Sequence, residues 1–401
     1  MCSRQQAVAL IRPRGVVALR RARWAALVSA LGFGLAWAPP LVPVANAAAP
    51  CQQPREAGQP RQQLPPQLWP QEQLNFTEAW ELTRGKGVKV AIIDSGVDAS
   101  HPQLRGRVTQ YDVTNTGNED CVGHGTEVAG IIGAADMRAQ GIPFLGVAPA
   151  AELISIKAAT GSQQNDPKWA PLAIRRAVNL GAKVINMSSQ SPDYPELRAA
   201  VRFALDRDVV IVAAAGNIRD QSQTPRNAYP ASYEGVIAVG ALNKDGSLAT
   251  FSNQTTPVTV TAPGQSVVST WPQGTYHMSD GTSQAAPFVA GTAALIRSYH
   301  PKMNREQVKR QIELTADGSR GAGTGSGIVN PLRAVTTVAR GQAAVAAVPH
   351  KVKIDQPPPD DRTGRIIALS IAGGTLAAAA AVAAAAVVIP AGRRRGWRSG
   401  I

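Results

Sequence analysis

Between residues 76 and 337, short apolar runs bounded by turn-forming residues alternate with amphipathic segments. Continuous apolar runs of this kind are typical of strands covered on both faces of a parallel sheet. The alternation predicts an α/β fold, in which a doubly wound, mostly parallel sheet carries helices on both faces. The predicted strands are 88–93, 145–157, 183–189, 209–215, 236–241 and 258–262, and the predicted helices are 76–83, 169–180, 196–206 and 305–315.

A further apolar segment, 279–296, predicts a helix that starts at a Gly-Thr turn directly before Ser283. Pro287 falls in its first turns, where a missing N–H costs least. Ser283 therefore lies among unpaired backbone N–H groups at the positive end of the helix dipole. A serine in this position is either a helix cap or a nucleophile. The second reading requires a base and an orienting carboxylate elsewhere in the chain.

Both groups are present in turn-rich settings. Asp94 ends the apolar run 88–93, at the carboxyl edge where α/β sheets place their sites, and His124 lies between two glycines in the run GHGTEVAG. Imidazole titrates near neutrality and can take the hydroxyl proton, while a buried carboxylate fixes its tautomer. We therefore expect Ser283 to be the nucleophile, His124 the general base and Asp94 its orienting group. The alternatives are a solvated loop carboxylate at Asp94 and a helix cap at His124.

The order Asp94, His124, Ser283 resembles that of the subtilisin-like serine proteases (subtilases, peptidase S8), over about residues 72 to 337. The resemblance implies a subtilisin-like fold. Asn217, at the end of the run VAAAGN, matches the asparagine that stabilises the oxyanion in this family. Without the other residues, it would be read as an asparagine that tolerates a turn.

The strand that ends in VINMS differs from the subtilase pattern at one point. Subtilases usually follow it with Leu-Gly, whereas this chain has Ser189-Gln190. The resemblance implies that Ser188, Ser189 and Gln190 contact substrate. We expect Gln190 to restrict the pocket for the residue preceding the cut; the alternative is simply a more polar rim.

The net charge of +14 is concentrated at the two ends of the chain. Residues 1–47 contain six arginines and residues 391–401 contain four, with no acidic residue in either segment, which leaves +4 for the rest. The middle of the chain has no basic stripe with interleaved aromatic residues, so nucleic acid is not an expected partner.

Residues 1–47 have the pattern of a signal peptide. Arginines precede the apolar run 25–38, and Ala45-Asn46-Ala47 supplies small residues for cleavage. An uncleaved anchor is the alternative. The following Pro/Gln-rich N-terminal extension, 48–75, cannot form its own core, and we expect it to lie extended along the surface of the protease domain, 76–337.

Three cysteines are present, at positions 2, 51 and 121. Removal of the signal peptide leaves Cys51 and Cys121, and in an exported chain this even pair predicts a disulfide. Two unpaired thiols are the alternative. No metal site is expected, because paired Cys or His spacings are missing; structural calcium is only weakly supported, and no cofactor is expected.

A Pro-rich linker, 338–365, precedes the charge-free segment 366–390, which is long enough to cross a bilayer. The arginines of the tail 391–401 favour a cytoplasmic C-terminus. We therefore expect a single-pass protein of the cell membrane, with the protease domain outside the cytoplasm. A small-residue helix that never inserts is the alternative.

The whole layout, together with the lead-in NFTEAWELTRGKG at 75–87, resembles the mycosins, membrane-anchored subtilases associated with type VII secretion. The resemblance implies hydrolysis of secreted proteins through an acyl-enzyme, with protein substrates and secretion membrane-complex components as partners. It also implies an alternative, a structural subunit that stabilises the complex with catalysis secondary. A general degradative subtilase is a third possibility, which the membrane segment and Gln190 disfavour.

Overall fold

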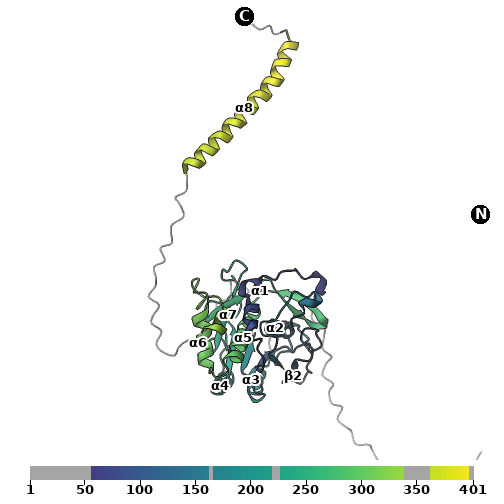
Figure 1. The fold of residues 1–401 in the computed structure, drawn as a ribbon, viewed down its shortest axis with the longest axis vertical. Coiled ribbons are helices and arrows are strands. Elements are labelled where there is room, and N and C mark those ends of the chain that lie inside the picture. Colours follow the sequence, from purple (N-terminus) through teal and green to yellow (C-terminus); the bar gives the residue numbers. More distant parts are fainter. Residues whose placement is uncertain (1–55, 162–165, 219–225, 338–361, 397–401) are drawn as a thin grey trace, which may run out of the picture. The chain divides into compact units, whose positions relative to one another are not determined.

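The computed structural model describes residues 56–161, 166–218, 226–337 and 362–396 (Figure 1). The chain divides into two units, Met1–Thr337 and Val338–Ile401, each considered by itself. The predicted signal peptide, Cys51 and the predicted linker up to residue 361 lie outside the described residues, so those predictions stay predictions.

A seven-stranded sheet forms the centre of the first unit, in the order β2-β3-β1-β4-β5-β6-β7, and all its pairings are parallel. Its strands are β1 (Lys89–Asp94), β2 (Val108–Asp112), β3 (Glu152–Lys157), β4 (Val184–Met187), β5 (Val210–Ala214), β6 (Ile237–Leu242) and β7 (Val260–Pro263). A separate antiparallel hairpin pairs β8 (Val267–Trp271) with β9 (Thr275–Ser279).

The helices of this unit are α1 (Trp69–Leu74), α2 (His124–Gly133), α3 (Trp169–Asn179), α4 (Pro195–Leu205), α5 (Thr282–Tyr299), α6 (Arg305–Thr315) and α7 (Pro331–Thr336). Short 3-10 turns occur at η1 (Arg61–Gln63), η2 (Phe76–Glu81), η3 (Arg138–Gln140) and η4 (Pro272–Gly274). The start of α6 is well defined, because Asn304 and Gln307 form a capping box in which the side chain of each accepts the backbone N–H of the other.

Successive side chains along the buried strands belong alternately to two hydrophobic cores. Val90 and Ile92 of β1 join the core that includes α2 and α5, whereas Ala91 and Ile93 join the core that includes α3 and α4. Figure 1 shows α3 and α4 next to one another and α5 in the middle of the domain. The predicted mostly parallel, doubly wound sheet with helices on both faces is therefore confirmed.

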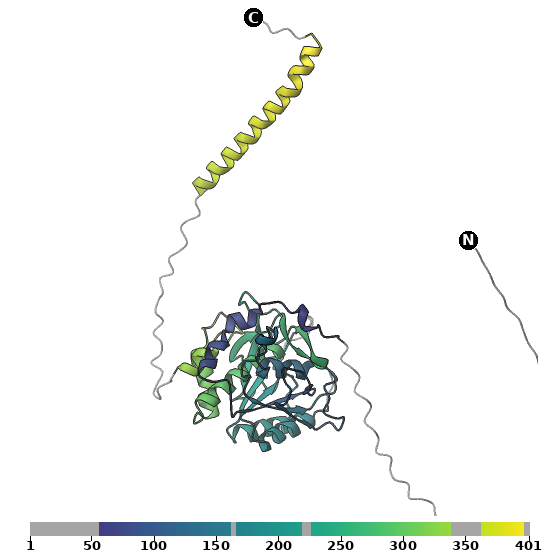
Figure 2. The ribbon, with the colours of Figure 1, turned by 45° about the vertical axis from the view of Figure 1, so that its right-hand side comes forward.

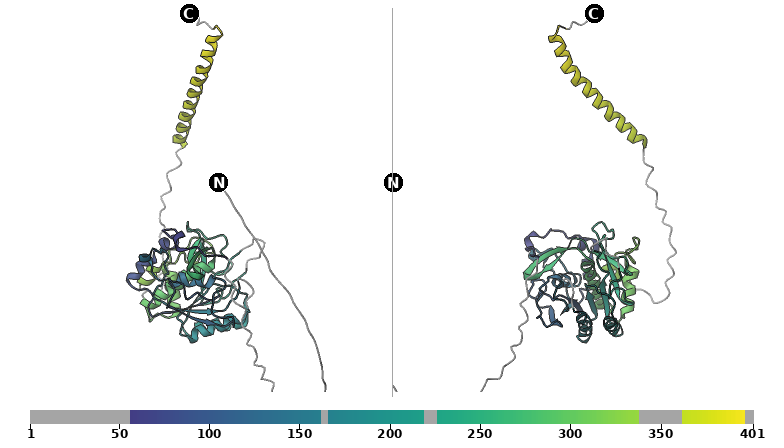
Figure 3. Two further views of the ribbon diagram at one scale, coloured as in Figure 1. Left: turned by 90° about the vertical axis from the view of Figure 1, so that its right-hand side faces the viewer. Right: turned by 180° about the vertical axis from the view of Figure 1, so that it is seen from behind.

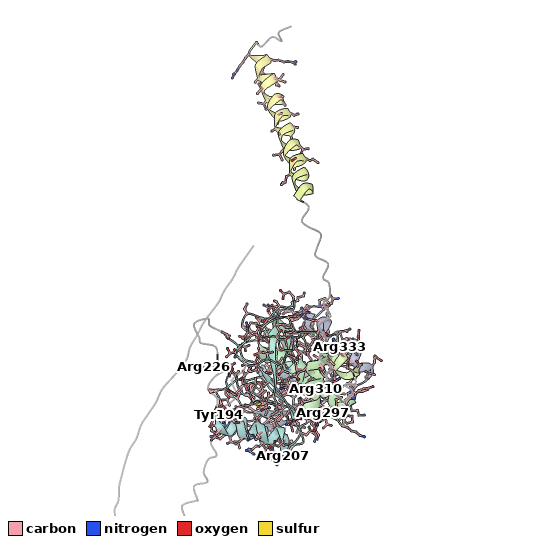
Figure 4. All side chains as sticks on the ribbon, turned by 90° about the vertical axis from the view of Figure 1, so that its left-hand side faces the viewer. Tyr194, Arg207, Arg226, Arg297, Arg310 and Arg333 are labelled. Carbon is pink, nitrogen blue, oxygen red and sulfur yellow. The ribbon has the colours of Figure 1, made fainter. Side chains whose placement is uncertain are left out.

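The two faces are joined at the C-terminal end of α5. Arg297, labelled in Figure 4, lies in the last turn of this helix, and its guanidinium bonds Asp208 Oδ2 at 2.9 Å, beyond the end of α4. Asp208 Oδ1 in turn accepts the backbone N–H of Arg305, the first residue of α6. This ion pair connects the C-terminal end of α5 with the residues that follow α4 and with the start of α6.

The N-terminal extension runs along the outside of the domain, as the purple segment in Figures 2 and 3 shows. Gln59 pairs with Tyr276 of β9 through two backbone hydrogen bonds, of 2.6 and 2.9 Å. Its later part differs from the expected extended chain, because α1 forms there and Leu68 and Leu74 are buried in the main core. The apolar positions near 68–74 thus belong to the folded domain.

Helix α8 (Arg362–Arg394) belongs to the second unit. Its segment Leu369–Arg394 spans 26 residues with a mean hydropathy of 2.1, long and apolar enough by composition to cross a membrane. Most of the exposed large apolar side chains that the structure describes lie on this helix, among them Leu369, Leu376 and Val387.

Candidate functional site

Asp94 and His124 meet at the carboxyl edge of the sheet. Asp94 is the last residue of β1 and is buried, and His124 is the first residue of α2. His124 Nδ1 lies 2.7 Å from Asp94 Oδ1, and the imidazole side chain keeps 27% of its surface exposed. The sequence-predicted pair is therefore brought together, with the imidazole partly accessible from solvent.

The glycines on either side of His124 allow close packing. A Cβ at Gly125 would overlap the carbonyl oxygen of Gly96, in the turn that follows Asp94. A Cβ at Gly123, whose φ is +91°, would overlap the ring of Trp271. Glycine is thus needed on both sides for α2 to begin against the end of β1.

Buried Asp120 secures the turn that precedes His124. Its carboxylate accepts the backbone N–H groups of Gly123 and Thr126, both at 2.8 Å, and the hydroxyl of Ser95 at 2.8 Å. Burial raises the pKa of Asp120, against the effect of these hydrogen bonds. The carboxylate ties the turns after β1 and before α2 into one unit.

The electrostatics of the pair favour the imidazolium form. Burial of the ring acts to lower the pKa of His124, but the charge and hydrogen bond of Asp94, with smaller contributions from Glu127 and Asp120, outweigh it and raise this pKa to about 9. An imidazole held in this way retains a proton that it receives.

Ser283 is the second residue of α5 and is partly buried. Ser188, at the end of β4, donates its hydroxyl to the carbonyl oxygen of Ser283 at 2.8 Å and receives a 3.0 Å hydrogen bond from Asn186 Nδ2. Two side chains of the sheet therefore fix the backbone at Ser283. Pro287 lies inside α5 within its first two turns, as the sequence predicted.

The Ser283 hydroxyl donates to Gln284 Oε1 at 2.8 Å. The amide nitrogen of Gln284 donates to Glu127 Oε2 at 2.9 Å, and Glu127 lies one turn after His124 on α2. This bond links α2 to α5 close to their N-termini, so His124 and Ser283 stand at the beginnings of two helices that are joined there.

Asn217 lies just beyond β5, in the turn after Gly216. Its Oδ1 accepts both the backbone N–H of Thr282, at 2.9 Å, and the Thr282 hydroxyl, at 3.1 Å. Because Oδ1 is held by the residue before Ser283, the Nδ2 amide is the end of the side chain that can donate to another group.

The segment after β4 has two exposed residues, Ser189 and Gln190, following buried Ser188. Gln190 Oε1 accepts the backbone N–H of Asn217 at 3.2 Å, and a Cβ at Gly216 would overlap that oxygen. The Gln190 side chain therefore fills the space beside Gly216, between the ends of β4 and β5. Ser188 bonds the α5 backbone, a role that the sequence did not indicate.

Sequence reasoning missed several groups around the site. Glu127 and Gln284 are 1% and 2% exposed, and His277 of β9 lies 3.9 Å from Glu127 and 2.8 Å from Glu56. The Glu127 carboxylate, aided by Glu56, raises the pKa of His277. The signal for the first two was local, because each is a long polar side chain directly before the apolar part of its helix.

Two other groups lie outside this cluster. His101 is fully buried, its Nε2 lies 3.1 Å from the Thr275 carbonyl oxygen, and burial lowers its pKa to about 4, as in a structural histidine. Cys121 lies in the described loop, but Cys51 does not, so their pairing stays a prediction. Among the described residues, no group of three His, Cys, Asp or Glu side chains could hold a metal ion.

Comparison with known proteins gives relatives that match this arrangement. The model of the subtilase family, peptidase S8, matches residues 85–346. Subtilisin E of Bacillus subtilis (strain 168) is 42% identical over 235 residues, which cover 58% of this chain and 61% of that protein. An intracellular serine protease of Paenibacillus polymyxa is 37% identical over 262 residues, covering 61% and 79%. The chain thus spans about three-fifths of the length of the subtilisins it matches.

Solved structures of mycosins share the fold. MycP1 from Mycobacterium smegmatis superimposes with a TM-score of 0.63 at 26% identity, over 76% of this chain and 98% of that one. The MycP3 protease from the type VII (ESX-3) secretion system gives a TM-score of 0.61 at 30% identity, over 75% and 99%. Because the family model covers well over half of its length, this chain belongs to the subtilase family of serine peptidases.

Proposed function

We propose that this chain is a membrane-anchored, extracytoplasmic serine endopeptidase that cleaves secreted proteins and works with a type VII secretion system. The observation that carries the catalytic part is the 2.7 Å pairing of His124 with Asp94 on a helix bonded to the start of α5, where Ser283 lies. Family membership supports the same chemistry.

In the proposed reaction, His124 Nε2 takes the hydroxyl proton as Ser283 Oγ attacks the substrate carbonyl carbon, and the resulting imidazolium is stabilised by Asp94. The same proton then passes to the leaving amine as the peptide C–N bond breaks, which leaves an acyl-serine. Water, deprotonated by His124, releases the acid and restores the hydroxyl. The raised pKa of His124, about 9, favours the imidazolium that holds this proton between steps, although it also makes the neutral base the minority form below that pH.

Asn217 is proposed to stabilise the tetrahedral oxyanion. Its Oδ1 is occupied by Thr282, so Nδ2 is available beside the N-terminus of α5, where backbone N–H groups also face the reacting carbonyl. Donors fixed before the reaction need no reorganisation when the negative charge develops.

Gln190 is proposed to set specificity. Its amide lies against Gly216 and the Asn217 backbone, and so it shortens the space that the side chain before the scissile bond would enter. We expect small residues there, such as glycine, alanine and serine. One methylene group in such a pocket changes kcat/KM by about 10–200-fold. Gln190→Gly is therefore expected to extend cleavage to leucine and phenylalanine, measured with a set of peptides that differ at this residue only.

The mycosin likeness supports the proposed partner system, since the serine protease MycP1, whose fold is similar, is described as an essential component of the type VII (ESX-1) secretion system. The length and apolar composition of Leu369–Arg394 support the anchor, and the arginines at its end favour a cytoplasmic C-terminus. Carbonate extraction tests the anchor: the full chain is expected in the membrane pellet and a chain ending at residue 337 in the supernatant.

The deciding experiment for catalysis is covalent labelling by a serine-directed phosphonate. Labelling of the purified chain is expected to disappear in Ser283→Ala and to slow by about 10²–10⁴-fold in His124→Ala, because the base is lost. His300→Ala is a suitable control, since that ring bonds the Val335 carbonyl oxygen, away from the site. Equal labelling of the Ser283→Ala variant would refute the assignment of the nucleophile.

The second candidate is a structural subunit of the secretion complex, and the mycosin neighbours are the observation that favours it. Secretion measured in a strain with Ser283→Ala and in one without the gene separates the two. Secretion retained with the variant and lost with the deletion would support a structural role; loss in both would support catalysis.

A further inference from the structure

A chain of buried polar side chains runs from Ser283 into the space behind α2 and α5. Gln284, 2% exposed, accepts the hydroxyl of Ser283 and donates to Glu127, which is 1% exposed. The other Glu127 oxygen accepts the hydroxyl of Ser279 from β9. Every member of this chain points to the next, in a region otherwise packed with alanine, valine and isoleucine.

The carboxylate fixes which end of the Gln284 amide faces Ser283. A carboxylate accepts hydrogen bonds and donates none, so the amide group facing Glu127 must be NH₂. The amide oxygen is thereby turned toward Ser283, where it can only accept. Glu127 therefore imposes on Gln284 the one orientation that draws a proton from the serine hydroxyl.

This bond competes with the one that catalysis needs. A hydroxyl has a single proton. While Ser283 donates it to Gln284 Oε1, the same proton is not donated to His124 Nε2, and the general base has nothing to remove. The hydroxyl must turn about the Cα–Cβ or Cβ–Oγ bond before it can be activated.

We propose that Gln284, oriented by Glu127, is a positioning residue that holds the Ser283 hydroxyl in a resting orientation and slows acylation. The inference rests on the proposed role of Ser283 as nucleophile. Two features support it: the amide has no access to water that could replace the bond, and its second bond, to Glu127, opposes rotation of the amide. Breaking a neutral hydrogen bond of ordinary strength slows a step by about 3–10-fold.

The test compares phosphonate labelling and peptide cleavage in the intact chain and in Gln284→Met, which has a similar volume but offers no strong acceptor. We expect the labelling rate and kcat to rise about 3–10-fold, with KM unchanged. The acid limb of the pH profile is expected to stay in place, because the variant leaves Asp94 and His124 untouched. A rate that is equal or lower in a folded Gln284→Met protein would overturn the proposal, as would a shifted acid limb.

Two further variants keep this result interpretable. Glu127→Gln can donate as well as accept, so it no longer fixes one orientation of the Gln284 amide; its labelling rate, compared above pH 9 where His124 is neutral in both proteins, is expected to rise by at most as much as that of Gln284→Met. A gain larger than that of Gln284→Met would mean that the buried charge, not the glutamine acceptor, restrains the serine, and no gain would show that Glu127 does not orient the amide; either result would overturn the proposal. Gln311→Met removes a similarly buried glutamine that bonds the carbonyl oxygens of Ala334 in α7 and of Thr337 just after it, and is expected to lower the melting temperature without changing the rate.

The labelling pattern separates this inference from the proposed function. Labelling of both the starting protein and Gln284→Met at one rate refutes only the positioning role. No labelling of either refutes the nucleophile and the positioning role together. Labelling of Gln284→Met alone supports both, with a restraint larger than expected.

Discussion

The helices α2 and α5 both begin at the site, but different kinds of interaction hold their first residues. At α2, close backbone packing of Gly125 on Gly96 decides, and the Asp120 carboxylate adds hydrogen bonds to the surrounding N–H groups. At α5, side chains decide, since Ser188, Asn217 and Gln284 each bond a group of residues 282–283. Close backbone packing leaves one arrangement, whereas a hydrogen bond between side chains can be exchanged for another at small cost. The start of α2, and with it His124, is thus held by packing, whereas the Ser283 side chain can exchange its hydrogen-bond partner.

The variant with the largest expected effect tests the side chains that hold the start of α5. Asn217→Ala removes the proposed oxyanion donor and should lower kcat by about 10²–10³-fold with little change in KM, the range known for such a donor in a subtilisin, a relative of this chain. Thr282→Val, which removes only one of the two donors to Asn217 Oδ1, should have a smaller effect. Steady-state cleavage of one peptide by both variants checks the order. An equal loss of kcat in both variants would mean that the loss comes from altered packing of α5 and not from the missing oxyanion donor.

Gly125→Ala tests the backbone packing at the start of α2. The added methyl group has no room against the Gly96 carbonyl, so α2 must move, and a displacement of about 1 Å is expected to cost about 10²-fold in activity. Gly133→Ala, in the last turn of the same helix, meets Leu153 Cδ2 at 3.2 Å and the Ala148 carbonyl oxygen at 3.3 Å, far less tight than the 1.9 Å at Gly125, and serves as the matched control. Labelling rate and melting temperature report the two effects. A fully active Gly125→Ala protein would show that α2 is as adjustable as α5.

The pH dependence reports on the fixed pair. The base must be neutral to act, so a pKa of about 9 predicts that kcat/KM rises tenfold per pH unit up to about pH 9 and then levels, a gain of about 10²-fold from pH 7. Asp94→Asn removes the charge that raises the pKa and should move this limb to lower pH. The folding stability changes with pH in the opposite direction to kcat/KM. The raised pKa of His124 contributes stability that is fully present below about pH 6.5 and is lost as the pH rises toward 9. A limb near pH 6.5 in the starting protein would contradict the strong coupling.

The smallest effect concerns Ser188. Ser188→Ala deletes one neutral hydrogen bond to the Ser283 carbonyl and is expected to slow labelling by about 3–10-fold. Ser189→Ala changes an exposed neighbour and should leave the rate unchanged. If the two variants are labelled at the same rate, the Ser188 hydrogen bond is not needed to hold the backbone at the start of α5. In that case α5 depends on side-chain bonds less than proposed, and differs less from α2.

Much of the fold follows from the sequence, because its central strands are continuous apolar runs between turn residues. Strands β4, β5 and β6 lie within a residue or two of the predicted runs, and α6 begins and ends where predicted. Strand β2 was missed because it lies at the sheet edge, where VTQYD is only partly buried and shows no apolar run. The 76–83 segment winds as a 3-10 turn rather than an α-helix, a difference that hydrophobic spacing does not resolve.

For the site, short motifs identified Asp94 and His124, because glycine-rich turns beside a polar residue are conspicuous in the sequence. The Glu127–Gln284 bond joins residues 157 positions apart, and nothing in either helix specifies the other as its partner. Ser188 shows the same limit, since a strand-end serine gives no sign that it bonds the Ser283 carbonyl across 95 residues. Local patterns predict which groups are present; the pairing of distant side chains requires the fold.

The backbone pairing of Gln59 with Tyr276 has one more consequence. Strand β9 has β8 on one side, and the incoming chain occupies its other side at Tyr276 through main-chain bonds. Open strand edges recruit extended polypeptide, both foreign segments and neighbouring copies. By pairing Gln59 with Tyr276, the molecule occupies this part of the edge with its own main chain, so that another extended segment cannot bond the same groups.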